Sequence, residues 1–336
     1  MPSAPLAVIA SRRGRQKALR HWEYGALALI ALALRVWGLA SKSLWIDETF
    51  SLGMVSQGWP SFAHTILFVQ PNMELFYFLL KLASAITPAA WQHGEFFWRL
   101  IPALAGALTV LAIYPLARRL FGVRVALLAA ALVATNEFLI EYSQQARGYT
   151  LFALIFTLSF VALVRWLESD RHAIIWFGVL SALGFLTQAF EVVFLAGQLA
   201  FVAIVASRGR AVRWPSLALA LAPVALVVLA RYPIYAAHPD QVAWIQRPTL
   251  NDLYNGAIQL SGGTGGTASR LELPILLATI VAIAFLIGYA LALAARRTWI
   301  TPFQSIAWKG RLDLIEAIAL VVCWIVIPVF GTWLGS

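Results

Sequence analysis

Long apolar runs with almost no charge recur along this 336-residue chain, and they limit its fold more than any other feature. Each run is long enough to cross a hydrocarbon layer of roughly 30 Å as a helix. Because a backbone in lipid has to pair its own polar groups, such runs form helices there. The predicted spans are residues 22–40, 98–117, 123–140, 149–167, 173–188, 190–206, 214–231, 273–294 and 314–334. The predicted fold class is therefore all-α: a polytopic membrane protein with about nine transmembrane helices in a single domain, 1–336.

The distribution of charge orients these helices. With the N-terminus in the cytoplasm, 17 of the 25 Lys and Arg residues fall on the cytoplasmic side. They are Arg12, Arg13, Arg15, Lys17, Arg20, Arg118, Arg119, Arg124, Arg165, Arg171, Arg208, Arg210, Arg213, Arg296, Arg297, Lys309 and Arg311. This positive-inside bias recurs at every second loop and predicts a multi-pass protein of the inner membrane. The net charge of +10 thus reflects orientation in a lipid bilayer and predicts no nucleic-acid partner.

Three polar segments then face the periplasm or the cell exterior. They are residues 41–97, 141–148 and 232–272. Long ordered loops are usually functional, so any chemistry is expected on that face. The first segment contains candidate interfacial helices near Trp45 and Trp59. A tenth apolar stretch, 73–87, follows Pro71 and is expected to be interfacial or re-entrant.

The histidines and the cysteine give no sign of a metal site, a cofactor or a disulfide. Cys323 is the only cysteine, so it cannot form an intrachain disulfide. His64, His93 and His238 are scattered without the spacing of metal ligands. We therefore expect no cofactor, and the sequence offers no support for a divalent metal.

An acidic pair, Asp47-Glu48, directly follows the first predicted span. A carboxylate at the membrane surface can act as a general base by removing the proton of an attacking hydroxyl. Such a reaction resembles the base half of an inverting glycosidase, with a sugar hydroxyl in place of water. The alternative is that both acids occupy the first turn of an interfacial helix, where they favour the helix dipole.

The second outer segment places Arg147 at a helix entrance, between Tyr142 and Tyr149. A guanidinium can bind a lipid phosphate through two parallel hydrogen bonds. The alternative is an interfacial arginine that extends toward the headgroups beside aromatic residues. Lys42 is a second, weaker candidate for the phosphate.

Several polar side chains before and within 73–87 are candidates for binding substrate hydroxyls. They are Gln70, Asn72, Glu74 and Tyr77, and Tyr142, Gln145 and Tyr149 of the second outer segment join them. For Asn72 the alternative is that it caps the helix that follows Pro71.

Four motifs in order along the chain resemble the bacterial membrane glycosyltransferases related to protein O-mannosyltransferases. This group of the GT-C superfamily includes the aminoarabinose transferase of lipid A and the rhizobial galacturonic-acid transferases. The motifs are Ser43-Leu44-Trp45-Ile46-Asp47-Glu48, Arg99-Leu100-Ile101-Pro102-Ala103-Leu104, Tyr142-Ser143-Gln144-Gln145-Ala146-Arg147-Gly148-Tyr149 and Ala243-Trp244-Ile245-Gln246-Arg247-Pro248-Thr249-Leu250. Together they resemble the family from about residue 25 to the end.

The resemblance implies transfer of a sugar, such as a hexose, mannose or a uronic acid, with inversion at the anomeric carbon. The implied donor is a polyprenyl-phosphate sugar, and the acceptor is a hydroxyl of a lipid, a glycan or a protein. Asp47 would be the catalytic base, Glu48 would position the acceptor or the base, and Arg147 would hold the carrier phosphate.

The chain departs from the family pattern at three places. Gln145 stands where the family usually has Glu, and Gln70 and Asn72-Met73 replace a His-Pro-Pro-Leu run. The chain also stops at Ser336, where relatives continue through further helices, so it is expected to be a C-terminally short member.

Two other functions fit a polytopic chain: a transporter or lipid flippase, and an inactive subunit that binds lipid carriers. Transporters place charges and broken helices at the membrane midplane. Here the predicted spans are nearly free of charge in their inner parts, which favours chemistry at the surface. Arg35 and Lys81 lie near outer ends and are expected to extend to the surface.

Overall fold

The computed structural model describes residues 23–70, 72–238, 249–260 and 312–335. Within these ranges every regular element is a helix and no strand occurs, which confirms the predicted all-α class. Outside the described residues lie the predicted span 273–294, Pro71, most of the later outer loop 232–272 and the motif residues 243–248.

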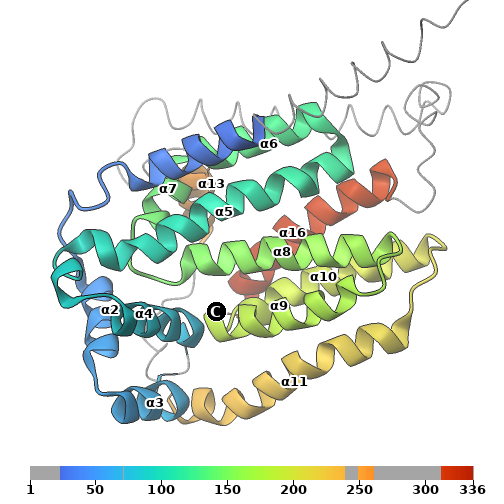
Figure 1. Cartoon of the computed structure of the whole chain (residues 1–336). Helices are drawn as coiled ribbons and strands as arrows, with labels where there is room; N and C mark the ends of the chain where they lie inside the picture. The colour runs from blue at the N-terminus through green and yellow to red at the C-terminus, as the bar shows by residue number, and fades with distance from the viewer. Residues whose placement is uncertain (1–22, 71, 239–248, 261–311, 336) are drawn as a thin grey trace, which may run out of the picture.

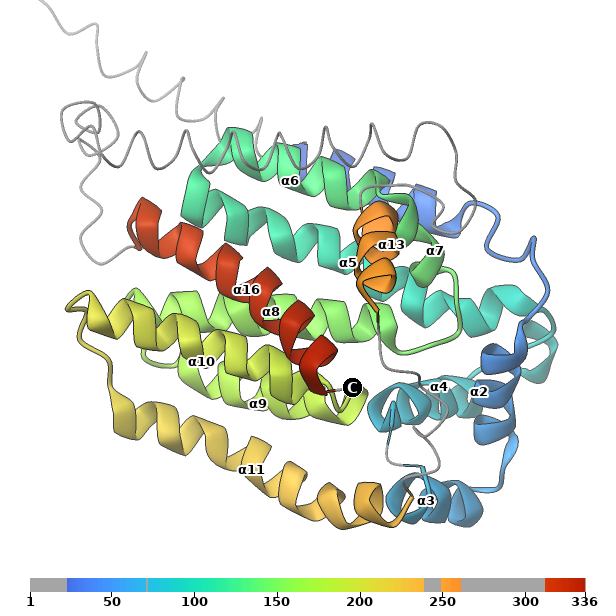
Figure 2. The same ribbon diagram turned by 180° about the vertical axis from the view of Figure 1, so that it is seen from behind.

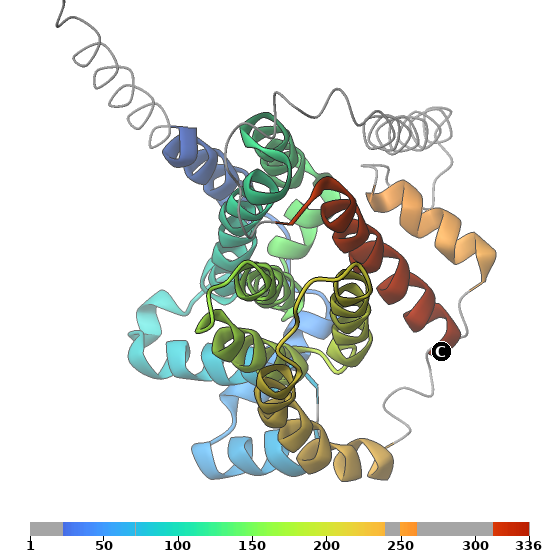
Figure 3. The ribbon, with the colours of Figure 1, turned by 90° about the vertical axis from the view of Figure 1, so that its right-hand side faces the viewer.

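The long helices run side by side across the molecule (Figure 1). They are a first helix, 23–36, followed by α5 (Glu95–Phe121), α6 (Val123–Thr135), α8 (Tyr149–Leu167), α9 (Ala173–Thr187), α10 (Glu191–Ser207), α11 (Trp214–Ala237) and α16 (Leu314–Gly335). Helix α8 packs against α5 and α9, α9 packs against α11, and α10 packs against α16. A shorter helix, α13 (Leu250–Leu260), lies at the edge of the molecule on the side of α16 (Figure 3).

Three of the described helices, α5, α8 and α11, are long and apolar enough to cross a membrane by themselves. Helices α9 and α10 and the stretch Leu314–Val329 of α16 are apolar but shorter. At 1.5 Å per residue the 15 residues of α9 extend about 22 Å, less than the roughly 30 Å of a hydrocarbon core. The structure thus confirms a polytopic membrane protein of several apolar helices.

The predicted span 123–140 is not one continuous helix. It divides into α6 and α7 (Glu137–Ser143), which meet at an angle of 57°. Asn136 between them has an extended backbone, and its side chain accepts a hydrogen bond of 3.0 Å from the N–H of Leu139. A side chain that caps the second helix in this way ends the first one.

Arg35 occupies this break and does not extend to the surface as expected. Its side chain is 1% exposed and donates to the carbonyls of Val133 (3.1 Å) and Ala134 (3.3 Å), at the end of α6. These carbonyls have lost their helical partners, and a buried cation pairs them. Gly106 of α5 permits the close approach, because a Cβ there would lie 2.8 Å from Nε of Arg35.

The predicted interfacial segments are helices gathered at one end of the bundle (Figure 1). They are α2 (Ile46–Ser56), α3 (Trp59–Phe68) and α4 (Glu74–Ile86), followed by the 3-10 helix η1 (Ala89–Trp91). Met54, Phe62 and Tyr77 pack into one core there, whereas Ile46 and Phe50 are exposed. We call this end, which includes the connections 144–148 and 188–190, the loop end.

The opposite end of the bundle carries arginine–carboxylate pairs. They are Arg119–Glu168, Arg165–Asp170, Arg208–Asp313 and Arg210–Glu316. All four arginines belong to the set that the charge bias predicts on the cytoplasmic side. The fold therefore separates this basic end from the loop end, which carries the acidic pair.

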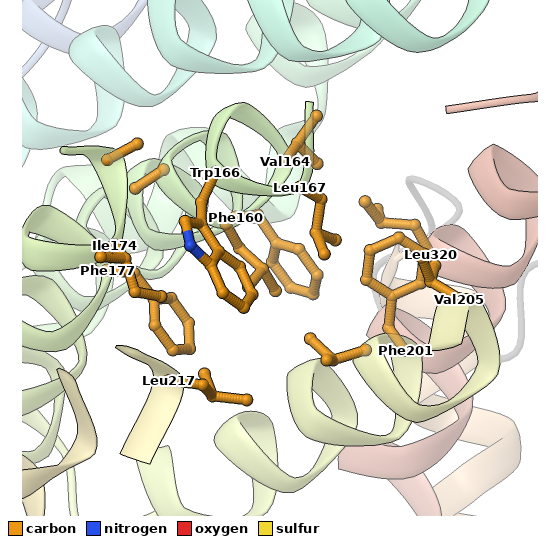
Figure 4. Packing of buried hydrophobic residues seen from close by; sticks show 14 of the residues in the cluster. Phe160, Val164, Trp166, Leu167, Ile174, Phe177, Phe201, Val205, Leu217 and Leu320 are labelled. Atoms are coloured by element: carbon orange, nitrogen blue, oxygen red, sulfur yellow. The ribbon is translucent and has the colours of Figure 1, made fainter. Parts of the chain in front are cut away.

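The largest core lies between α8, α9, α10, α11 and α16 (Figure 4). Phe160, Phe177 and Phe201 are fully buried in it, and helix association in lipid relies on such packing. A Cβ at Gly178 would lie 2.0 Å from the carbonyl oxygen of Ala220, so a glycine is required where α9 meets α11. This packing fixes where each helix ends, and thereby places the side chains at the loop end. Figure 2 shows the same arrangement from behind.

Candidate active site

Asp47 and Glu48 lie in the first turn of α2. The Glu48 Oε2 accepts a hydrogen bond from the N–H of Trp45 (3.2 Å), the residue that precedes the helix. A glutamate that reaches back to the first N–H of its helix stabilises the helix start. Adjacent residues of a helix point in different directions, so Asp47 and Glu48 have different surroundings.

Glu48 is 1% exposed and forms an ion pair with Arg99 of α5. Nε of Arg99 donates to Oε1 (2.8 Å) and Nη2 donates to Oε2 (2.7 Å). The N–H of Ala146 also donates to Oε1, at 2.7 Å. With the bond from Trp45, the carboxylate accepts four hydrogen bonds, which is about its full capacity.

Burial raises the pKa of Glu48, but the hydrogen bonds from Arg99, Ala146 and Trp45 outweigh burial and hold the pKa below its ordinary value. Arg99 also donates to the carbonyls of Leu39, Lys42 and Ser43, which fixes the segment that leads into α2. Of the two roles expected for Glu48, these contacts fit positioning of the base and leave no oxygen for an acceptor.

Asp47 is half-buried, and its carboxylate accepts no hydrogen bond from the residues that the structure describes. Nη1 of Arg147 lies 3.4 Å from the carbonyl oxygen of Asp47 and donates to Oη of Tyr77 (3.1 Å). The guanidinium also stands 5.8 Å from the centre of the Tyr149 ring, and Tyr142 packs against that ring. The structure therefore brings five of the predicted site residues together.

Arg147 keeps hydrogen-bonding capacity that the described residues do not use. Its Nε is buried, and no described residue accepts a bond from it. Burial lowers the pKa of Arg147, whereas Tyr77, Tyr149 and Asp47 raise it, and the net shift is upward. The side chain points into this group of residues and does not extend away from the protein.

Two other cations of the loop end, Lys81 and Arg231, bind carbonyls at the ends of short helices. Nζ of Lys81, which was expected to extend to the surface, donates to the carbonyls of Val55 (2.7 Å) and Gln57 (2.6 Å) at the end of α2. Arg231 of α11 donates to the carbonyls of Ile66 and Leu67 at the end of α3. Each of these cations binds two backbone carbonyls, whereas Arg147 reaches only one among the described residues, at 3.4 Å, so Arg147 is better suited to an external anion.

Lys42 and Gln145 line a separate pocket of about 330 Å³. Its other walls include Leu39, Ser43, Trp45 and Glu141, with the Glu48–Arg99 pair between them. Asp47 and Arg147 are not among its lining residues. The predicted site is thus divided, and Lys42 lies in a different part from Arg147.

Glu74, the first residue of α4, pairs with Arg231. Burial raises its pKa to about 7, although Arg231 opposes the shift. Nε of Arg231 and Oη of Tyr235 are buried without partners among the described residues. A sugar bound by Glu74, as predicted, would therefore have to share the carboxylate with Arg231.

The alternative for Asn72, that it caps α4, is wrong. The residue at the helix start is Met73, in a left-handed conformation (φ 59°), and the Oδ1 of Asn72 is buried without a partner in the described part of the chain. Gln70 is half-buried and only its backbone N–H has a hydrogen bond, to Thr65. Among the described residues no hydrogen bond joins either side chain to Asp47 or Arg147.

Sequence reasoning did not assign Arg99, Arg231 or the N–H of Ala146 to the site. Each arginine stands near the end of an apolar span, where a charge needs a partner. That rule signals that Arg99 and Arg231 have acidic or carbonyl partners, but it does not identify them.

Nowhere in the described ranges do three His, Cys, Asp or Glu side chains gather as they would around a metal ion. The reactive groups there are carboxylates, phenols and arginines.

Residues 70–233 match the family model of the dolichyl-phosphate-mannose-protein mannosyltransferases. The matched segment includes Tyr77, Arg99 and Arg147, while Asp47 and Glu48 precede it. No curated protein and no solved structure matches the chain. This match supports the predicted resemblance of the chain to the protein O-mannosyltransferase-like family of membrane glycosyltransferases.

Proposed function

We propose that this protein transfers a sugar from a polyprenyl-phosphate donor to a hydroxyl acceptor on the periplasmic or extracellular face, with inversion. Asp47 is the general base and Arg147 binds the carrier phosphate. The observation that carries the proposal is a group of three side chains at the loop end: the Asp47 carboxylate, which accepts no hydrogen bond from the described residues, Arg147, whose Nε has no partner among them, and Tyr77.

The orientation follows from the two ends of the bundle. The basic end faces the cytoplasm of an inner-membrane protein by the positive-inside rule, so the loop end faces outward. Lipid-linked donors present their phosphate at the membrane surface, where Asp47 and Arg147 would meet it.

The reaction is a single displacement. The Asp47 carboxylate takes the proton of the acceptor hydroxyl while that oxygen forms a bond to the anomeric carbon. The bond between the anomeric carbon and the phosphate oxygen breaks, and polyprenyl phosphate leaves with the electron pair. The proton on Asp47 then passes to solvent, which restores the base.

The leaving phosphate is a stable anion, so it needs a cation more than an acid. Arg147, whose Nε has no partner among the described residues, offers its positive charge to the oxygen on which charge grows. By analogy with a single oxyanion-hole donor, such a contact is worth roughly 2.7–4 kcal/mol. Glu48 takes no part in proton transfer in this scheme, because Arg99 already neutralises it.

The test uses purified protein in liposomes with radiolabelled polyprenyl-phosphate mannose, with and without an added hydroxyl acceptor, measuring release and transfer of the sugar and movement of the lipid across the bilayer. Asp47→Asn is expected to lower both release and transfer by at least a hundredfold, because the base is lost. The matched control is Glu137→Gln, an exposed acid in the first turn of α7.

Undiminished sugar release by Asp47→Asn would remove Asp47 from the mechanism. Movement of the intact lipid between leaflets without sugar release would instead support a transporter or flippase. Binding of the lipid without either activity would support a carrier-binding subunit.

A further inference from the structure

The pocket beside Glu48 is not explained by proton transfer or phosphate binding. It lies between the segment that leads into α2, which contributes Lys42 and Trp45, and the end of α7, which contributes Glu141 and Gln145. Its volume of about 330 Å³ is at the small end of ligand-binding pockets, which range over roughly 300–1,000 Å³.

The pocket is held in shape by bonds that do not depend on a ligand. Nε2 of Gln144 donates to the carbonyls of Arg35 (3.2 Å) and Trp37 (2.8 Å), which ties the end of α7 to the first helix. The Glu48–Arg99 pair fixes the other side through the carbonyls of Lys42 and Ser43. A preformed site of this kind binds without a large ordering cost.

The lining has the chemistry of a site for a neutral, polyhydroxylated ligand. Trp45 brings an apolar indole ring to the lining, Lys42 brings a group that can donate hydrogen bonds, and Glu141 brings one that can accept them. Oε1 of Gln145 is buried with no partner among the described residues. An anion would meet Glu141 and a cation would meet Lys42, whereas a sugar ring can use both.

The pocket also lies close to the reacting groups along the chain. Trp45 is two residues from Asp47, and Gln145 is two residues from Arg147. The residue between the latter two, Ala146, donates its N–H to Glu48, which separates the pocket from the Arg147 side. A ligand held by Trp45 and Gln145 therefore lies on the other side of the Glu48–Arg99 pair from Arg147 and does not occupy the phosphate site.

We infer that this pocket binds one uncharged sugar unit of the acceptor, so that the acceptor is a glycan. The assignment to the acceptor rests on the proposed transferase function, while the binding of a sugar does not. Lys42 then belongs to the acceptor pocket and not to the donor phosphate.

The experiment measures binding of methyl α-mannopyranoside to the full-length protein in nanodiscs by saturation-transfer NMR. Trp45→Ala and Gln145→Leu are each expected to weaken binding at least tenfold. Trp91→Ala is the matched control, because Trp91 is an exposed tryptophan of the same outer segment that does not line the pocket. Trp45→Phe keeps an aromatic face and is expected to restore most of the binding if Trp45→Ala loses it.

Four results would overturn the inference. They are absence of binding to the unaltered protein, undiminished binding by Trp45→Ala, equal loss in Trp91→Ala, and displacement of the mannoside by farnesyl phosphate. The last result would place the sugar on the Arg147 side. Because no donor is present, this test can fail while Asp47→Asn still abolishes sugar release, and the reverse also holds.

Discussion

Two buried arginine–glutamate pairs connect the helices of the loop end to the long helices, and they differ in how completely they are hydrogen-bonded. Arg99 of α5 binds Glu48 of α2, and Arg231 of α11 binds Glu74 of α4. In both pairs the glutamate lies in the first turn of a short helix. In both, the arginine also binds carbonyls of a neighbouring loop or helix end.

The first pair is fully satisfied and the second is not. Both oxygens of Glu48 accept from Arg99 and from backbone N–H groups, and the pKa of Glu48 lies below its ordinary value. Glu74 accepts through one oxygen only, Nε of Arg231 is unpaired within the described structure, and burial raises the pKa of Glu74 to about 7. Two pairs of the same residue types thus give glutamates with opposite pKa shifts, because hydrogen bonds to the charged form outweigh burial in only one pair.

The largest expected effect comes from breaking the satisfied pair. Arg99→Ala would leave the Glu48 carboxylate buried without its partner, and such a change costs roughly 3–5 kcal/mol of unfolding free energy. Thermal unfolding of the protein in detergent would measure the loss. The double variant Glu48→Gln with Arg99→Ala should recover part of it, because no unpaired charge remains.

Arg165→Ala is the control for that comparison, because the Arg165–Asp170 pair at the basic end is largely exposed. Removing an exposed pair changes the unfolding free energy by about 0–1 kcal/mol. If Arg99→Ala were no more destabilising than Arg165→Ala, then Glu48–Arg99 would not be the fixed wall between the two parts of the site.

The second prediction concerns pH and isolates the incompletely paired Glu74. Its pKa is about 7 in the folded protein against 4.5 ordinarily, so the folded state holds a proton that the unfolded state loses. Stability is therefore expected to fall as the pH rises from about 4.5 to about 7, and then to level off. The fall should be on the order of 1–3 kcal/mol, since one full pKa unit corresponds to about 1.36 kcal/mol and the group is partly screened.

Glu74→Gln should remove that slope, and the difference between the two proteins cancels the titration of the histidines. Glu48 contributes in the other direction. Because its pKa is lowered in the folded protein, its contribution to stability is lost only as the pH falls below the ordinary pKa of a glutamate. A slope that persists in Glu74→Gln would show that another group titrates in this window.

The sequence predicted the members of the Asp47 and Arg147 group but not the partners of the two glutamates. Because the spans alternate in direction, the segments that carry Asp47, Tyr77 and Arg147 meet at one end of such a bundle. That these residues share one end, and lie roughly near each other, therefore follows from topology. Glu48 and Arg99 are 51 residues apart, and their pairing depends on how α2 packs on α5. A sequence pattern does not contain that packing.

The break between α6 and α7 was also missed, for a local reason. The stretch 123–140 is apolar enough to suggest one span, and Asn136 alone is tolerated in many helices. What ends α6 is the combination of the Asn136 cap with Arg35, which lies about 100 residues earlier and pairs the freed carbonyls. Arg35 within an apolar run was the available signal, since a cation there needs buried acceptors.

The smallest expected effect tests whether the second pair is incomplete in the way that the structure indicates. Oη of Tyr235 lies near Glu74 and Arg231 and is buried without a partner among the described residues. Tyr235→Phe is therefore expected to leave the unfolding free energy within about 0.5 kcal/mol or to raise it, because an unsatisfied hydroxyl contributes no bond. Tyr77→Phe is the matched comparison, since the Tyr77 hydroxyl accepts from Arg147 and its loss should cost roughly 0.5–1.5 kcal/mol. If Tyr235→Phe destabilised the protein as much as Tyr77→Phe, the Tyr235 hydroxyl would have a partner in the native protein, and the contrast between the two arginine–glutamate pairs would be smaller than their described contacts imply.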